Sequence, residues 1–115
     1  MKFFYCFYLL VFGIILFPGS AFSANEMFRS VNSGNWNSTS TWEMSTNGGG
    51  VWFPATSVPH DTSGTTTVRS PNTVTVTVST SSNQLVIDGG GTLTINSGVV
   101  LTTPNGTGNE VTVAP

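Results

Sequence analysis

The chain has 115 residues, a net charge of −2 and only 7% charged side chains, while 38% of its residues are hydrophobic. Three basic residues against five acidic ones cannot neutralise a run of phosphates, so the composition argues against nucleic acid as a partner. The single cysteine, Cys6, excludes a disulfide framework within the chain. The chemistry of the surface must therefore come mainly from Thr, Ser and Asn side chains.

The N-terminal segment has the layout of a secretory signal. Lys2 is followed by an apolar run over residues 3–17, and Ala21 and Ser23 are small residues of the kind that a signal peptidase accepts. The sequence predicts a signal peptide over 1–23, with cleavage after Ser23. The apolar run is shorter than the roughly 20 residues of a spanning helix, so we expect no membrane span after cleavage and a secreted or cell-surface location.

Residues 24–60 form a distinct segment that contains all three tryptophans of the chain. One interpretation is an aromatic platform of Trp36, Trp42 and Trp52 that binds an extracellular polysaccharide, because indole rings present large amphipathic faces. The other interpretation, which the position in the chain favours, is an aromatic N-terminal cap. The terminal units of repeat proteins have to cover an otherwise exposed apolar face.

Residues 61–115 carry short runs in which apolar residues alternate with threonine, separated by Gly, Asn, Ser and Asp. Alternation is typical of β-strands, whose successive side chains point to opposite faces. The apolar period of 3.6 residues that would indicate a helix does not occur here. Similar pairs recur 19 residues apart from Val74 to Leu93 and 18 apart from Leu93 to Val111. This step indicates the coils of a β-solenoid.

The solenoid interpretation predicts one inward apolar column. Its expected members are Val74, Val76, Val78, Leu93, Ile95, Val111 and Val113. Another apolar pair, Leu85 and Ile87, is out of phase with this column, so an antiparallel meander or β-sandwich remains the alternative. In that alternative the glycine-rich segment 88–91 is a hairpin turn, because glycine adopts positive φ at low cost.

A series of motifs runs from residue 28 to residue 103. In chain order they are a Gly-x-Trp, a second Trp, a Pro shortly before an Asp, and an L-x-I coil with glycines, at Gly34, Trp36, Trp42, Pro59, Asp61, Leu85, Ile87, Gly90, Leu93, Ile95 and Gly98. The series resembles the N-terminal segment of large exported bacterial β-helix proteins, often substrates of type IX secretion, and more distantly the eight-glycine domain of cell-surface proteins. The polar stretch after Asp61 is longer than in that pattern.

The resemblance implies an all-β chain that forms a right-handed parallel β-helix fragment of an adhesin-like or polysaccharide-associated protein. Members of this group continue for many more coils. We therefore expect residues 61–115 to be the first coils of a truncated solenoid. An open C-terminal end would then meet further coils, or would associate with another copy of the chain or with a partner.

Residues that could carry catalysis are scarce. His60 is the only histidine, and without a second histidine or a nearby cysteine it has no partner for a metal site. The sequence His60-Asp61 after Pro59 is typical of a turn. We predict no enzymatic activity, no catalytic residue, no metal and no cofactor, and we expect a non-catalytic structural or adhesive module. The alternative function is the carbohydrate-binding part of a polysaccharide-processing protein whose catalytic coils lie outside this chain.

Overall fold

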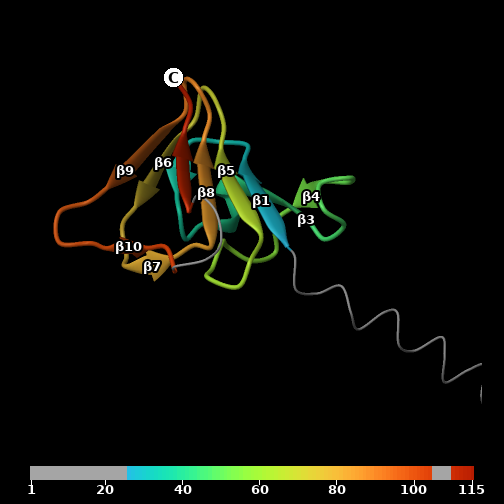
Figure 1. The fold of residues 1–115 in the computed structure, drawn as a ribbon, viewed down its shortest axis with the longest axis horizontal. Coiled ribbons are helices and arrows are strands. Elements are labelled where there is room, and N and C mark those ends of the chain that lie inside the picture. Colours follow the sequence, from blue (N-terminus) through green and yellow to red (C-terminus); the bar gives the residue numbers. More distant parts are fainter. Residues whose placement is uncertain (1–25, 105–109) are drawn as a thin grey trace, which may run out of the picture.

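The structure is a computed structural model that describes residues 26–104 and 110–115. The predicted signal peptide lies outside the described residues. The all-β class is confirmed, because the described chain is built of strands with one short 3-10 helix (Figure 1). In chain order the elements are β1 (Met27–Ser30), β2 (Gly34–Asn35), η1 (Thr39–Thr41), β3 (Trp42–Ser45), β4 (Phe53–Pro54), β5 (Thr65–Val68), β6 (Thr73–Val76), β7 (Thr80–Ser81), β8 (Gln84–Ile87), β9 (Thr92–Ile95), β10 (Leu101–Thr102) and β11 (Val111–Val113).

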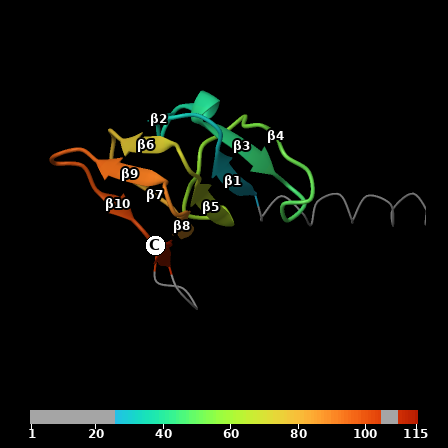
Figure 2. The ribbon, with the colours of Figure 1, turned by 90° about the horizontal axis from the view of Figure 1, so that it is seen from above.

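The strands form three sheets that surround a common interior (Figures 1 and 2). A long sheet has the order β11-β8-β5-β1-β3-β4, a second sheet has the order β2-β6-β9, and the third pairs β10 with β7. The long sheet is mixed, because β3 pairs antiparallel with β1 and with β4. All other pairs among the described strands are parallel.

The parallel pairs connect residues about one repeat apart. Thr66 of β5 lies opposite Leu85 of β8, and Val74 of β6 lies opposite Leu93 of β9, each a step of 19 residues. Val74 and Val76 are fully buried while the threonines between and beside them are not, which is the inside–outside alternation that the sequence predicts. The predicted pairing of Val74 with Leu93, and of Val76 with Ile95, is confirmed.

The glycine-rich segment after β8 is a turn between two different sheets. The Gly91 amide donates to the Asp88 carbonyl at 2.8 Å, and Gly90 has a φ of +92°. A side chain at Gly91 would place its Cβ 2.6 Å from the Val68 carbonyl oxygen, so the turn passes close to the preceding strand. The hairpin alternative is wrong at this point, because β8 and β9 pair with other strands and not with each other.

The predicted single column is wrong in its last members. Val111 and Val113 lie opposite Leu85 and Ile87 in the long sheet, and not over Leu93 and Ile95. The step from Leu85 to Val111 is 26 residues, because additional residues between β10 and β11 lengthen the path around the interior. The 18-residue spacing from Leu93 to Val111 is therefore not a structural repeat. Val78 also leaves the column, because it follows β6 and is 58% exposed.

The buried side chains form one cluster. It consists of Phe28, Trp36, Trp42, Met44, Val68, Val74, Val76 and Leu85. Within the long sheet the register places Phe28, Thr66, Leu85 and Val111 in one row. Phe28, Thr66 and Leu85 are at most 2% exposed, while Val111 is 48% exposed. Burial along this row is therefore lost at the end of the sheet that β11 forms.

Thr66 is a polar residue within this apolar row, and its hydroxyl has no hydrogen-bond partner among the described residues. A buried hydroxyl without a partner costs about 1–3 kcal/mol. Thr66→Val keeps the branched shape and removes the hydroxyl, so we expect it to raise the free energy of unfolding by about 1 kcal/mol. Urea titration measures this change. The control is Thr67→Val on the outer face of the same strand, expected to shift stability by less than about 0.5 kcal/mol. A loss of stability in Thr66→Val would contradict the expectation.

Candidate functional site

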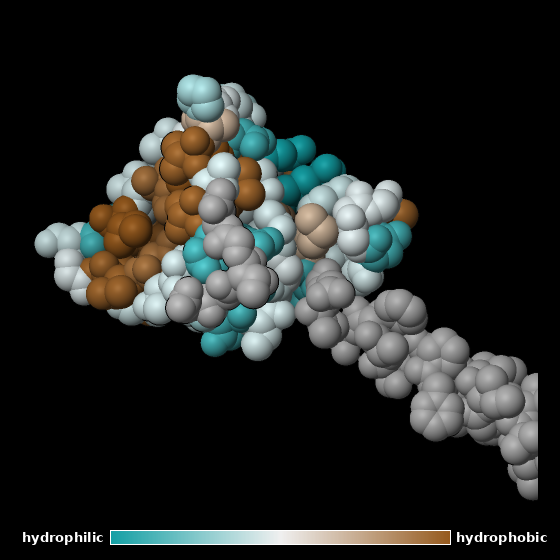
Figure 3. Space-filling model, viewed as in Figure 1, coloured by the Kyte–Doolittle hydropathy of each residue, from teal (hydrophilic) through white to brown (hydrophobic). Residues whose placement is uncertain are grey.

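The principal surface feature is the end of the molecule formed by the outer edges of β9, β10 and β11, which we call the open end. Each of these strands is last in its sheet among the described residues. Exposed apolar side chains gather on or beside it, namely Ile95, Val100, Val111 and Val113, with Val113 65% exposed. The space-filling view shows apolar surface over β9, β10 and β11 (Figure 3). Contiguous exposed apolar surface is uncommon on monomeric proteins, which makes the open end a candidate interaction surface.

The backbones of β9, β10 and β11 form hydrogen bonds to the preceding strand of their sheet, on one edge only among the described contacts. The Thr80 amide donates to the Val100 carbonyl at 3.0 Å, and the Asn96 amide donates to the Val76 carbonyl at 3.1 Å. β11 is tied to β8 in the same way, through Ala114 N–H to the Ile87 carbonyl at 2.9 Å. Their other edges face away from the sheets. No charged residue and no proline lies within the bounds of β9, β10 or β11, although natural edge strands usually carry such residues to prevent pairing.

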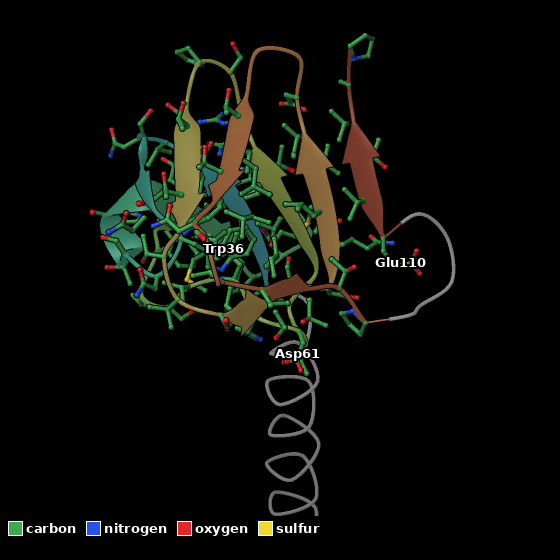
Figure 4. All side chains as sticks on the ribbon, turned by 90° about the vertical axis from the view of Figure 1, so that its left-hand side faces the viewer. Trp36, Asp61 and Glu110 are labelled. Atoms are coloured by element: carbon green, nitrogen blue, oxygen red, sulfur yellow. The ribbon has the colours of Figure 1, made fainter. Side chains whose placement is uncertain are left out.

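The opposite end contains two buried tryptophans. Trp36 and Trp42 are each 1% exposed, and their rings meet edge to face with centroids 5.2 Å apart. The Trp42 indole N–H donates to the Trp36 carbonyl at 2.8 Å, and the Trp36 indole N–H donates to the Pro59 carbonyl at 3.3 Å. Figure 4 shows Trp36 inside the body, at the end away from Glu110 and β11. Large aromatic rings with satisfied N–H groups can close an apolar interior without leaving a buried donor unpaired.

This burial bears directly on the predicted platform of Trp36, Trp42 and Trp52. Neither Trp36 nor Trp42 has an indole face open to solvent, so these two residues do not present a stacking surface for a sugar in this structure. Trp52 is half-buried and lies apart from them, with the Arg29 guanidinium 4.3 Å from the centre of its ring. The three tryptophans therefore do not form one surface.

Arg29 belongs to a small polar cluster that the sequence alone does not indicate. Its guanidinium forms an ion pair with Glu43 at 2.7 Å, on the outer face of the pair β1–β3. The antiparallel pairing of β1 with β3 brings the two residues together, and no period in the sequence reveals that pairing. Both side chains are more than a quarter exposed, so the pair contributes little stability by itself.

A shallow groove of about 360 Å³ lies beside this cluster. It is lined by Val31, Asn32, Thr39, Ser40, Trp42, Glu43, Pro54 and Ala55. The Asn32 amide is already engaged, because it donates to the Ser40 carbonyl at 2.9 Å. Hydroxyl, carboxylate and apolar side chains line the groove together, which is a composition that suits a small polar ligand. Its polar members carry no sequence motif, so they could not be predicted from the sequence.

His60 lies in a turn, as the sequence predicts. The His60 carbonyl accepts hydrogen bonds from the Ser63 amide at 3.2 Å and from the Ser63 hydroxyl at 2.6 Å. The imidazole Nε2 lies 3.6 Å from a Glu26 carboxylate oxygen, and Nδ1 lies 2.9 Å from the Thr62 hydroxyl. Asp61, the neighbour in sequence, is exposed in the same turn. No nucleophilic or metal-ligating group other than these is brought to His60 by the described contacts.

Residues 26–104 and 110–115 contain no group of three or more His, Cys, Asp or Glu that could hold a metal ion. Within the same ranges, no helix is both long enough and apolar enough to cross a membrane.

The fold and these surfaces define an all-β chain whose parallel strands are covered by aromatic residues at one end and open at the other. Comparison with protein-family models, with curated proteins and with solved structures finds no match to this chain.

Proposed function

We propose that this chain is the capped N-terminal end of an exported, right-handed parallel β-helix protein, and that it serves as a structural or adhesive module without catalytic activity. The single observation that supports this most is the row Phe28, Thr66, Leu85 and Val111. It is covered at its first three positions and exposed at its last. Buried tryptophans at one end of the chain and an exposed inward valine at the other suit an end at which further strands add.

The two ends would then have different tasks. Trp36 and Trp42 cover the first coil and keep other strands from adding there. At the open end, the unpaired edges of β9, β10 and β11 offer backbone groups and apolar side chains to further strands. The cap thus gives the stack a defined starting point, and coils can be added in one direction only. Export fits the predicted signal peptide over 1–23.

The experiment is to duplicate one coil within the full chain. Inserting a second copy of residues 82–102 after Thr102 repeats β8, β9 and β10 together with the two residues that precede β8. In a β-helix the new coil stacks on the old one, so we expect the insertion to fold. The urea m-value should rise by roughly a fifth, in proportion to the added buried surface, and the melting temperature should not fall.

The matched control inserts the same residues in scrambled order at the same place. It keeps length and composition but loses the alternation, so it is expected to form a loop that leaves the m-value near that of the parent chain. If the duplicated coil unfolds the chain, or behaves like the scrambled insertion, the β-helix proposal is wrong. Intact-mass measurement of the secreted protein tests export in parallel, because cleavage after Ser23 leaves Ala24 as the first residue.

A second candidate function is carbohydrate binding at the groove on the cap. The observation that favours it is that Thr39, Ser40 and Glu43 line one groove together with Pro54. Soluble polysaccharides that alter tryptophan fluorescence in the parent chain, but not in Ser40→Lys, would support this candidate. Saturable binding that survives the substitution would place the glycan elsewhere.

A further inference from the structure

The open end is stepped and not flat. The chain rises by one strand spacing, about 4.8 Å, for each turn around the interior of a β-helix. β9, β10 and β11 follow one another along the chain in three different sheets. In the proposed β-helix they would therefore end at successively higher levels, about a third of a spacing apart. β11 is the highest, because it adds a strand beyond β8 in the long sheet, while β9 is the lowest. Figure 4 shows β9 beside β6, and β8 and β11 following β5 in turn.

From this shape we infer that the open end binds a second copy of the same chain in a closed, two-fold symmetric dimer. The inference rests on the proposed β-helix and names the partner of its open end. In the dimer β11 of one copy pairs antiparallel with β9 of the other, β9 pairs with the partner's β11, and β10 pairs with the partner's β10. The highest strand of each copy thus fills the lowest position of the other.

Only this two-fold axis continues all three sheets. It passes through the face that carries β10 and exchanges the other two faces. An axis through the face of β11 would bring the two highest strands together and leave the remaining edges a strand spacing too far apart. An axis through the face of β9 would bring the two lowest strands together and force the higher strands to overlap. The stepped end is therefore self-complementary in one arrangement, as an isologous interface requires.

The side chains at this interface are compatible with the pairing. The inward residues Val111 and Val113 would lie opposite Ile95 and Leu93 of the other copy, and their exposed apolar surface would become shared interior. Threonines on the outer face would alternate with them, as they do in the existing sheets. Because no charged side chain lies within β9, β10 or β11, two identical ends meet without like-charge repulsion between these strands.

Copies cannot stack head to tail in the same way. The end opposite β11 is covered by Trp36 and Trp42, and the long sheet finishes there in β4, a two-residue strand that contains Pro54. Proline cannot donate to a sheet ladder and short edge strands discourage pairing. A blocked end and a self-complementary end together give a dimer that closes, and not a fibre.

The test uses the full chain, expressed with its own N-terminal segment in a Cys6→Ser background. Sedimentation over a range of concentrations should show a reversible dimer of the parent chain. Val113→Lys places an ammonium group in the shared interior and is expected to weaken the dimer by at least tenfold. The matched control is Val51→Lys, which changes a valine of similar exposure, 61%, in the loop before β4. It should dimerise like the parent. Tryptophan fluorescence confirms that both variants keep the folded cap.

Cross-linking tests the arrangement. The antiparallel register that places Val111 opposite Ile95 also places Thr112 of β11 opposite Thr94 of the partner's β9. We expect chains carrying Thr112→Cys and chains carrying Thr94→Cys to form disulfide-linked heterodimers when they are mixed and oxidised, and neither variant to cross-link with itself. Self-linking of Thr112→Cys would show β11 against β11 and overturn the arrangement. A parent chain that stays monomeric at high concentration, or a concentration-dependent fibre, would overturn the dimer itself. If the coil duplication folds as expected while no dimer forms, the proposed function survives and only this inference fails.

Discussion

Trp36→Ala is expected to leave the chain largely unfolded at room temperature. The Trp36 side chain is 1% exposed and contacts the Trp42 ring edge to face. Removing a buried tryptophan side chain costs about 3–5 kcal/mol, because its contacts are lost and a cavity remains. Small domains have total stabilities near the lower end of about 5–15 kcal/mol, so a single change of this size removes most of the free energy of unfolding.

The cause is specific to the covered end. Trp36 also donates its indole N–H to the Pro59 carbonyl, so the alanine variant leaves a buried carbonyl without that donor. The segment between η1 and β5 is held over the first strands partly by this bond. Its loss would expose the interior at the end where β2 pairs with β6.

Urea unfolding followed by far-ultraviolet circular dichroism measures the effect, and Trp52→Ala is the matched control. Trp52 is half-buried and contacts the Arg29 guanidinium on the outside of the sheet, so its removal is expected to cost about 1 kcal/mol. Equal losses in the two variants would show that Trp36 has no special part in covering the interior. A folded, undiminished Trp36→Ala protein would contradict the cap.

The strand pattern and the pairing of β6 with β9 could be predicted because they depend on local alternation and one constant step. Val74 and Leu93 are connected by a short path with a glycine turn, and the 19-residue repeat survives there. The position of Val111 could not be predicted in the same way. Its register depends on how many residues connect β10 to β11. An alternating sequence such as Val-Thr-Val also pairs equally well at several registers.

The aromatic segment shows a similar limit. Three tryptophans in residues 24–60 are compatible with a buried cap or an exposed platform. Their position in the chain favours the cap, but composition does not show which way each ring points. The structure places Trp42 in the interior, on β3 where it pairs antiparallel with Ser30 of β1, and places Trp52 outside, against the Arg29 guanidinium. That pairing joins segments without a shared period. The groove residues come from η1, β3 and β4 and from the segments beside them, and no sequence period joins these segments.

A disulfide across the parallel strands β5 and β8 is the second large effect we expect. Thr65 and Gln84 are register partners 19 positions apart, and their side-chain oxygens lie 3.3 Å from each other on the outer face. Neighbouring strands lie about 4.8 Å apart, which is within the range of Cα distances that disulfides span. In the double variant Thr65→Cys, Gln84→Cys, closing a loop of this length should stabilise the oxidised chain by about 3 kcal/mol relative to the reduced one.

The same pair of cysteines tests the parallel 19-residue stack most directly. Disulfide formation is measured as the loss of two hydrogens in the intact mass. The control is the double variant Thr65→Cys, Val86→Cys, in which the two Cα atoms would lie about 8 Å apart on the diagonal. The parallel register predicts rapid closure and a higher melting temperature for the Thr65–Gln84 pair, and neither for the Thr65–Val86 pair. Closure of the diagonal pair in preference to the direct pair, or no closure in either, would contradict the stacked arrangement on which the proposed function depends.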